Sequence, residues 1–247
     1  MQHNGLFQIP REILLEICSF LDISSLVKFT GSSRYLRSLA IRDIHYLPPC
    51  DKSLINHHLL QRFRNLYTLD LSDNEKVTDD DIRGMPIRKL NLSTNETITD
   101  DCIRGMPITE LNLWGNKTIT DSGIREMLII KLDLSCNRTI TDDGIRGLPI
   151  TKLILYNNKT ITDEGIRGMP ITILNLSFNT SITDDGIRGM PIINLNLSCN
   201  RSITDTGIRG MPIANLNLNQ NITITDDGIR RITTTNLRVN GRAMISV

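Results

Sequence analysis

The sequence predicts an α/β solenoid, a gently curved stack of short units whose strands form a parallel sheet. Most of the 247-residue chain repeats at a period of 21 residues, as in ITILNLSFNTSITDDGIRGMP at 171–191. Strict self-similarity is typical of repeat proteins, in which each unit buries its apolar side only against its neighbours. The most regular feature is a pair of apolar residues separated by one position: Leu69/Leu71, Leu90/Leu92, Leu111/Leu113, Leu132/Leu134, Leu153/Leu155, Leu174/Leu176, Leu195/Leu197, Leu216/Leu218 and Leu237/Val239.

The composition and charge exclude several classes of protein. The 28 Lys and Arg residues nearly balance the 27 Asp and Glu residues, so net charge provides no attraction to nucleic acid or to a membrane surface. No apolar run approaches the roughly 20 residues that span a bilayer, and the first residues, MQHNGLFQIP, lack the features of a secretory signal. We therefore expect a soluble protein that is cytoplasmic or nuclear and not secreted. Its five cysteines are expected to be free thiols.

Residues 6–46 predict a domain of three short helices. Pro10 is tolerated at a helix start, and apolar residues follow it at helical spacing. Ser24 and Ser25 are candidates for the cap of a second helix, and Gly31 separates that helix from a third. Three helices in about 40 residues bury too little surface to be stable alone, so their apolar rows are expected to pack on something else.

Residues 47–65 are expected to form a linker and the N-terminal cap of the array. They begin with a Pro-Pro pair, which breaks helices, and continue with apolar residues at helical spacing from Ile55 to Phe63. His57 and His58 are adjacent, so their side chains point in different directions on a helix, and no Cys or His stands at ligand spacing. We expect neither a metal site nor a cofactor.

Residues 66–236 contain eight units of the repeat. Each leucine pair has the alternation of a short strand whose two leucines point inward. An asparagine follows each pair, and its amide can satisfy backbone groups that the turn leaves unpaired. The segment ITDDGIRGMP then holds helix-start and helix-stop residues around a single helical turn, an outer arc narrow enough for gentle curvature. The unit resembles a short leucine-rich repeat, which implies a horseshoe.

One arginine per unit forms a column on the predicted outer arc: Arg83, Arg104, Arg125, Arg146, Arg167, Arg188, Arg209 and Arg230. A bare row of arginines would suggest phosphate binding. Each unit also supplies acidic residues nearby, such as Asp142 and Asp143. We therefore interpret the column as a charge-compensated Arg–Asp ladder.

Residues 237–247 end the array. Leu237 and Val239 keep the positions of the apolar pair, but Arg242 stands where the asparagine is expected. We predict a closing strand here. Arg238 and Arg242 would discourage edge-to-edge association with another sheet.

The N-terminal domain resembles the F-box, in the pattern IPxEILxxI…LD…LVxF…RxLxxLA that begins at Ile9. An F-box followed by leucine-rich repeats is the architecture of substrate receptors in SCF-type cullin–RING ubiquitin ligases. The resemblance implies that the domain docks on the small adaptor subunit that joins the receptor to the cullin, through an exposed apolar row on its first helix. By position it assigns adaptor contacts to Pro10, Ile13, Leu14, Ile17, Leu21, Leu26 and Val27. A helical cap that only shields the first repeat is the alternative interpretation.

A cluster of unusual side chains indicates where a substrate could bind. The residue after each leucine pair is Ser in most units, but two units have Trp114 and Tyr156, which stacked strands place about 10 Å apart. Trp and Tyr are enriched at binding hot spots, although drift among duplicated units is an equal alternative. We predict a substrate site on the concave face around the fourth to sixth units, with these residues: Trp114, Lys131, Asp133, Lys152, Tyr156 and Phe178.

The sequence predicts a binding protein and not an enzyme. No catalytic segment remains once the helices and repeats are assigned, and Cys102, Cys136 and Cys199 have no histidine partner for a thioester-forming reaction. The expected function is substrate recognition within an SCF-type ubiquitin ligase, as a monomer in a larger complex with the adaptor and a protein substrate. No nucleic-acid or membrane partner is expected. A stand-alone repeat scaffold or decoy that recruits no ligase is the alternative.

Overall fold

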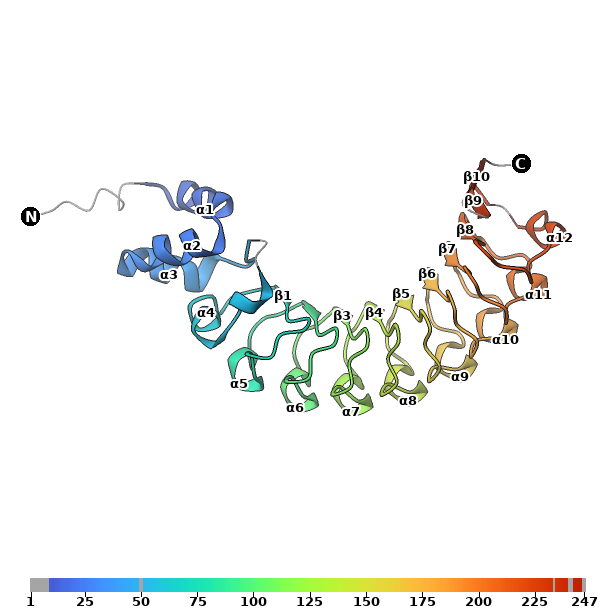
Figure 1. Cartoon of the computed structure of the whole chain (residues 1–247), viewed down its shortest axis with the longest axis horizontal. Coiled ribbons are helices and arrows are strands. Elements are labelled where there is room, and N and C mark those ends of the chain that lie inside the picture. The colour runs from blue at the N-terminus through green and yellow to red at the C-terminus, as the bar shows by residue number, and fades with distance from the viewer. Residues whose placement is uncertain (1–8, 49–50, 233, 240–241, 246–247) are drawn as a thin grey trace, which may run out of the picture.

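The chain forms an open arc with a helical domain at its N-terminal end (Figure 1). The computed structural model describes residues 9–48, 51–232, 234–239 and 242–245, with backbone only for the last range. Strands line the inner side of the arc and short helices line the outer side. The predicted α/β solenoid with a parallel sheet and short repeats is confirmed.

Three helices form the N-terminal domain: α1 (Arg11–Phe20), α2 (Ile23–Gly31) and α3 (Arg34–Asp43). The second helix starts earlier than predicted, because the Asp22 carboxylate caps it by accepting a hydrogen bond from the Ser25 backbone N–H at 2.8 Å. The third begins after the predicted break, where the Ser33 hydroxyl accepts from the Leu36 backbone N–H at 3.1 Å.

The cap of the array joins the helical domain to the first repeat through a 3₁₀ turn (Lys52–Leu54) and α4 (His57–Arg62). Arg62 donates a hydrogen bond to the Val27 carbonyl at 2.6 Å. Asn65 donates to the Arg42 carbonyl at 2.7 Å, and its own carbonyl contacts His45 Nδ1 at 2.8 Å. These contacts to both α2 and α3 fix the domain against the end of the array.

The described strands form one ten-stranded sheet in sequence order. Neighbouring strands pair in parallel with each leucine opposite the equivalent leucine of the next unit, as Leu69 lies opposite Leu90. The strands are β1 (Thr68–Asp70), β2 (Lys89–Asn91), β3 (Glu110–Asn112), β4 (Lys131–Asp133), β5 (Lys152–Ile154), β6 (Ile173–Asn175), β7 (Asn194–Asn196), β8 (Asn215–Asn217), β9 (Asn236–Val239) and β10 (Arg242–Ile245).

The last strand differs from the others, because β10 pairs antiparallel with β9. The array therefore ends in a hairpin that contains the predicted closing strand and adds a second one. Arg238 of β9 is exposed, and the side chain of Arg242 lies outside the described residues.

Each unit returns along the outer side through a four-residue helix: α5 (Asp79–Ile82), α6 (Asp100–Ile103), α7 (Asp121–Ile124), α8 (Asp142–Ile145), α9 (Asp163–Ile166), α10 (Asp184–Ile187), α11 (Asp205–Ile208) and α12 (Asp226–Ile229). From α7 onward the predicted threonine caps are present; the Thr141 hydroxyl, for example, accepts from the Asp143 backbone N–H. Because these helices are only one turn long, they stack nearly as closely as the strands do and the arc stays open.

The predicted asparagine column is confirmed as a structural ladder. Asn137 is fully buried and donates hydrogen bonds to the Leu113 and Asn116 carbonyls of the preceding unit at 3.2 and 3.0 Å. Its side-chain oxygen accepts from the backbone N–H groups of Thr139 and Ile140 at 3.0 and 2.9 Å. One amide thus satisfies four backbone groups of two units, and the pattern repeats along the array.

A second ladder joins the outer helices. The Asp121 carboxylate accepts from both the backbone N–H and the hydroxyl of Thr141 in the next unit, at 2.8 and 2.5 Å. A Cβ added to Gly144 would lie 2.3 Å from the same carboxylate, so a larger residue at this position requires that carboxylate to shift. Cys102 fills the equivalent position two units earlier in the array and donates its S–H to the Asp79 carbonyl at 3.5 Å.

Candidate functional site

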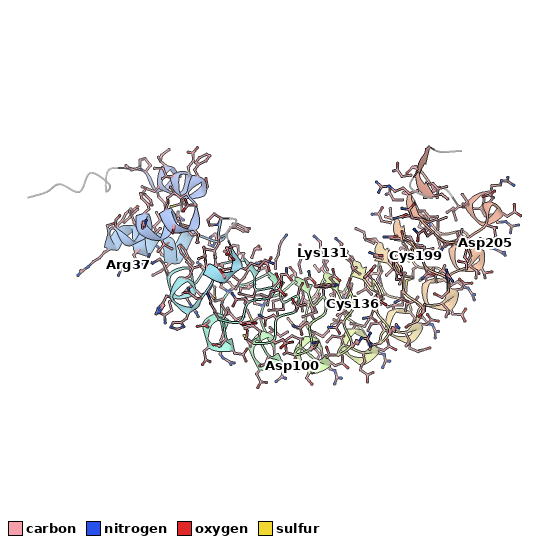
Figure 2. All side chains as sticks on the ribbon, viewed as in Figure 1. Arg37, Asp100, Lys131, Cys136, Cys199 and Asp205 are labelled. Atoms are coloured by element: carbon pink, nitrogen blue, oxygen red, sulfur yellow. The ribbon has the colours of Figure 1, made fainter. Side chains whose placement is uncertain are left out.

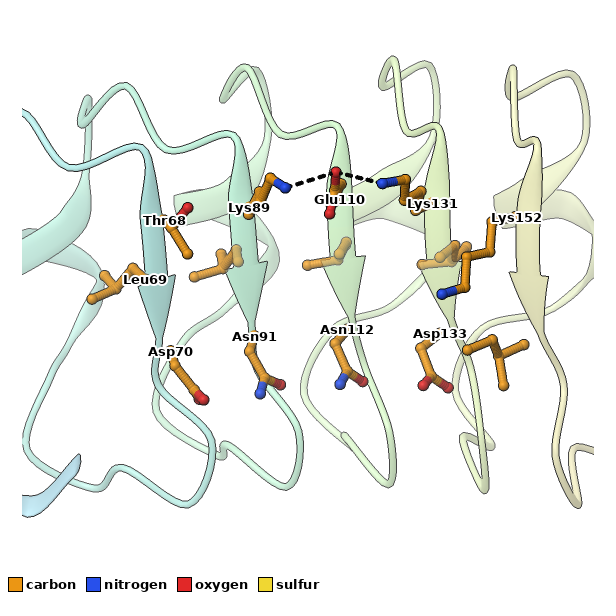
Figure 3. A pocket seen from close by; sticks show the side chains of 14 residues that line it. Thr68, Leu69, Asp70, Lys89, Asn91, Glu110, Asn112, Lys131, Asp133 and Lys152 are labelled. Atoms are coloured by element: carbon orange, nitrogen blue, oxygen red, sulfur yellow. Dashed lines mark hydrogen bonds and ion pairs between the residues drawn. The ribbon is translucent and has the colours of Figure 1, made fainter. Parts of the chain in front are cut away.

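The concave face presents the side chains that alternate with the inward leucines. Figure 3 shows its first half, where Glu110 lies between Lys89 and Lys131. The two ammonium groups lie 3.1 and 2.9 Å from the same carboxylate oxygen. The hydrogen bond from Lys131, assisted by Lys89, holds the pKa of Glu110 below its usual value. The neighbouring Lys152 makes no ion pair with another described residue.

Asp133 belongs to the same face, but its side chain is engaged within its own unit. Its carboxylate accepts from the backbone N–H and hydroxyl of Ser135 at 2.8 and 2.5 Å. The same contact recurs where Asn91 accepts from Ser93. This column shapes the turn after each strand, a role that the sequence analysis did not assign to Asp133.

The three predicted aromatic side chains lie beside the concave face and not on its strands. Trp114, Tyr156 and Phe178 belong to the turns that follow β3, β5 and β6. Backbone hydrogen bonds between units continue into these turns, as from the Cys136 N–H to the Tyr156 carbonyl at 2.9 Å. Trp114 is 45% exposed and Phe178 is 50% exposed. The Tyr156 and Phe178 rings pack edge-to-face with centroids 5.5 Å apart.

The structure therefore divides the six predicted substrate residues into two groups. Lys131, Asp133 and Lys152 line a groove on the concave face. The aromatic group lies along the turns of the adjoining edge. Figure 2 shows how the two sides of each unit differ, with Lys131 on the inner side and Asp100 on the outer side.

The first helix has two apolar stripes, and the prediction for Leu14 is wrong. Leu14 is fully buried with Cys18 in the core of the domain, so it does not belong to an exposed row. Ile13 lies on the other stripe and is 46% exposed. Phe20, which the sequence analysis missed, is 81% exposed at the end of the same helix. Spacing alone could not separate the two stripes, because both repeat at helical intervals.

The remaining predicted adaptor residues differ in exposure. Pro10 is exposed, and Ile17, Leu21 and Val27 are partly buried. Leu26 is 1% exposed and belongs to the core. The apolar surface that stays accessible is therefore centred on α1.

The arginine column is charge-compensated as predicted in six units, through pairs three residues apart such as Arg167 with Glu164 at 2.8 Å. The other pairs join Arg83 to Asp80, Arg104 to Asp101, Arg146 to Asp143, Arg188 to Asp185 and Arg230 to Asp227. Arg125 and Arg209 lack such a pair, because Ser122 and Thr206 replace the acidic residue.

His57 has a structural partner. Its Nδ1 contacts the buried carboxylate of Asp81, which also caps α5 by accepting from the Thr78 backbone N–H at 2.8 Å. Burial acts to raise the pKa of Asp81, but the hydrogen bonds from Thr78 and His57 outweigh it and lower the pKa. Among the described residues, no three His, Cys, Asp or Glu side chains gather in a way that could hold a metal ion.

The cysteines within the described ranges are free thiols. Cys18 and Cys102 are buried, and burial raises the pKa of Cys102 to about 12, which disfavours a nucleophilic thiolate. Cys136 and Cys199 are partly exposed. Cys50 lies outside the described residues. Within the same ranges, no helix is long and apolar enough to cross a bilayer.

Comparisons with known proteins bear on the array. A family profile described as leucine rich repeat matches residues 106–128, 129–148, 169–190 and 193–211. No curated protein matches the chain. Among solved structures, a chain in the crystal structure of the Rad7 and Elc1 complex in yeast is similar, with 14% sequence identity and a TM-score of 0.41. That similarity covers 98% of this chain and 88% of the matched chain.

Proposed function

We propose that this array, in which four segments match a leucine rich repeat profile, binds a protein substrate for an SCF-type ubiquitin ligase. In this proposal the N-terminal domain docks on the small adaptor subunit of the cullin, and the chain performs no chemistry itself. The F-box pattern that begins at Ile9 supplies the link to the ligase.

The observation that carries the proposal is the exposed apolar stripe of α1. Ile13 and Phe20 are 46% and 81% exposed on α1, whereas Leu14, Leu26 and Leu36 of the same domain are buried. Burying one such side chain at an interface contributes roughly 1.5–3 kcal/mol. The stripe lies on a helix that the cap contacts do not cover, since those contacts reach α2 and α3.

The repeats support the second half of the proposal. Exposed Trp and Tyr side chains are enriched at binding hot spots, and Trp114 and Tyr156 replace the serine that most units have in this column. Lys152 on the adjacent concave face makes no ion pair with a described residue and is available to a partner. The substrate site proposed here therefore spans the concave face and its turn edge.

Adaptor capture tests the proposal. We expect the double variant Ile13→Asp, Phe20→Asp to lose at least about tenfold of its affinity for the purified adaptor, because the interface would bury two unpaired carboxylates. Both residues are exposed, so the domain stays folded. The measurement is binding of the purified full chain to the adaptor by calorimetry.

Ile41→Asp on α3 is the matched control, since Ile41 is 40% exposed in the same domain but on a different helix. Wild-type affinity in the α1 variant would refute the F-box interpretation. The stand-alone scaffold then remains, in which the contacts of Arg62 and Asn65 make the helices a cap for the first repeat.

A further inference from the structure

Three cations lie on the same edge as the exposed aromatic side chains. Arg138, Lys159 and Arg201 occupy one column, three residues after the column of Trp114 and Tyr156. Both columns flank the same turn of the repeat, on either side of the buried asparagine. All three cations are exposed, and none of their side chains bonds to another described residue.

The charge of this column changes sign along the array. Glu75 and Glu96 occupy it in the first two units, and Lys117 of the third unit lies 3.7 Å from Glu96. From Arg138 to Arg201 the column contains no acidic residue. The middle of the array therefore has a basic edge although the whole chain is nearly neutral.

The acidic residues of the outer arc do not neutralise these cations. The Asp142 carboxylate accepts two hydrogen bonds from Thr162 of the next unit, at 2.8 and 2.5 Å. The Asp143 carboxylate lies 3.1 Å from the guanidinium of Arg146, the residue that follows the same helix. Because the same hydrogen bonds and ion pairs recur along the array, the outer acidic residues are already engaged. The cations of the turn edge are therefore available to a partner.

We propose that this aromatic–basic edge binds an extended acidic segment of a protein partner that also carries an apolar side chain. The edge consists of Trp114, Arg138, Tyr156, Lys159, Phe178 and Arg201. Three strand steps separate Arg138 from Arg201, roughly 14 Å, which an extended peptide covers in about four residues. Acidic side chains pair with the cations, and the apolar side chain packs against the Tyr156–Phe178 pair. This inference specifies which kind of protein segment the repeats recognise. It therefore rests on the proposed function, in which the array binds a protein substrate.

The ring geometry favours a peptide over single-stranded nucleic acid. Successive bases stack on aromatic faces that lie open along a strand. The Tyr156 and Phe178 rings are instead inclined at 67° to each other, so each covers part of its neighbour. A wedge between two inclined rings suits an aliphatic or aromatic side chain.

Peptide selection tests the inference without the adaptor. The purified full chain selects from a random phage-displayed library of peptides of about 12 residues, which is long enough to cover the edge. We expect the enriched peptides to combine several Asp or Glu residues with an apolar residue. The strongest peptide, labelled with fluorescein, is then measured by anisotropy. Its affinity should fall as salt rises.

Charge reversal locates the site. The double variant Arg138→Glu, Arg201→Glu should lower the affinity for the peptide by about tenfold or more, because attraction between opposite charges becomes repulsion. The fold tolerates this change because Glu96 occupies the same column in an earlier unit. Arg125→Glu with Arg209→Glu is the matched control: it alters net charge equally, uses two unpaired arginines of the outer arc, and should change affinity less than about twofold.

A second variant tests the aromatic part with residues that other units carry. Tyr156→Ser with Phe178→Asn should also weaken binding by about tenfold, since Ser135 and Asn157 stand at these positions elsewhere. Circular dichroism melting verifies that each variant is folded. Equal weakening by the edge and control pairs, an absence of acidic peptides, or tighter edge-dependent binding of an oligothymidine would each overturn the inference. Adaptor binding is unaffected by these outcomes, so the two proposals can fail separately.

Discussion

Glu126 has a left-handed backbone conformation at a position where most other units have glycine. Its φ is 67°, and the equivalent residues of neighbouring units, such as Gly105 and Gly147, also have positive φ. A side chain in this left-handed region costs about 1–2 kcal/mol. At the equivalent glycines an added Cβ would meet nothing within 4 Å, so no packing compensates for the strain.

We therefore expect Glu126→Gly to raise the free energy of unfolding. The gain should be about 0.5–1 kcal/mol, because the greater flexibility of glycine in the unfolded chain offsets part of the relieved strain. Urea unfolding followed by circular dichroism measures it. Gly147→Glu is the reverse control and should destabilise the protein, and an unchanged midpoint in both variants would contradict the assignment of strain.

At the level of single residues, the sequence predicted buried positions better than exposed ones. The inward leucines and the asparagine column follow from hydrophobic alternation and amide chemistry, and the structure confirms both. Leu14 and Ile13 could not be told apart, because the two stripes of α1 are equally apolar and only the packing of α2 and α3 selects between them. The cap at Asp22 was missed because two serines nearby are equally good candidates.

Among the structural elements, the turn after each strand depends most on one side chain. Removing the Asn137 amide would leave three backbone groups without this partner, the Asn116 carbonyl and the N–H groups of Thr139 and Ile140. The Leu113 carbonyl would keep its bond from the Asn116 backbone N–H. Each buried unsatisfied group costs about 1–3 kcal/mol. We expect Asn137→Ala to lower the free energy of unfolding by at least about 3 kcal/mol. The comparison is with Asn215→Ala on the exposed concave face, measured by urea unfolding.

If both variants lose a similar free energy of unfolding, the asparagine ladder does not contribute more to stability than the exposed asparagines do. A larger loss for Asn137→Ala should also appear as faster hydrogen exchange in the turns of both adjoining units. That second measurement separates a break in the ladder from a general loss of helix or strand packing.

The element boundaries show where sequence reasoning succeeded and where it stopped. The one-turn outer helices follow from the short distance between cap and stop signals in ITDDGIRGMP, and all eight have the predicted length class. The terminal hairpin was missed although the dipeptide Asn-Gly at 240–241 is a strong sequence signal for a hairpin. The sequence analysis predicted a single closing strand there.

Across the whole molecule, the carboxylates with lowered pKa values lie toward the N-terminal end. Backbone N–H groups lower the pKa of Asp22 and Asp51, and Lys131 lowers that of Glu110. Burial opposes the shift in Asp70 and Asp81, but hydrogen bonds from hydroxyl and backbone groups outweigh it. A depressed pKa in the folded state stabilises the protein above the unfolded pKa of about 4, and the stabilisation disappears as pH falls through the folded value.

We therefore predict that acid loosens the N-terminal end of the arc before the C-terminal end. Hydrogen exchange followed by mass spectrometry at pH 7 and near pH 3 measures it, after correction for the intrinsic exchange rates. Protection should decrease more between residues 22 and 110 than between 130 and 230. A uniform decrease along the arc would contradict the prediction.

The overall shape was predictable because one unit determines it. A parallel stack with a narrow outer arc follows from the repeat, whereas the placement of the helical domain does not. That placement depends on long-range contacts such as Arg62 with the Val27 carbonyl, between residues that share no pattern. The aromatic–basic edge was not predicted for the same reason. Its residues come from several units, and the geometry of the turns places them on one edge.

The two ladders between units also bear on how such a chain changes over time. Most units present the same asparagine, aspartate and glycine to their neighbours, so almost any of these units can follow any other without a new interface. Unequal recombination between the near-identical coding segments can therefore delete, add or reorder units while the interior remains compatible. Such an event changes the order of the side chains on the turns. The ligand preference of the array can therefore change while its fold is kept.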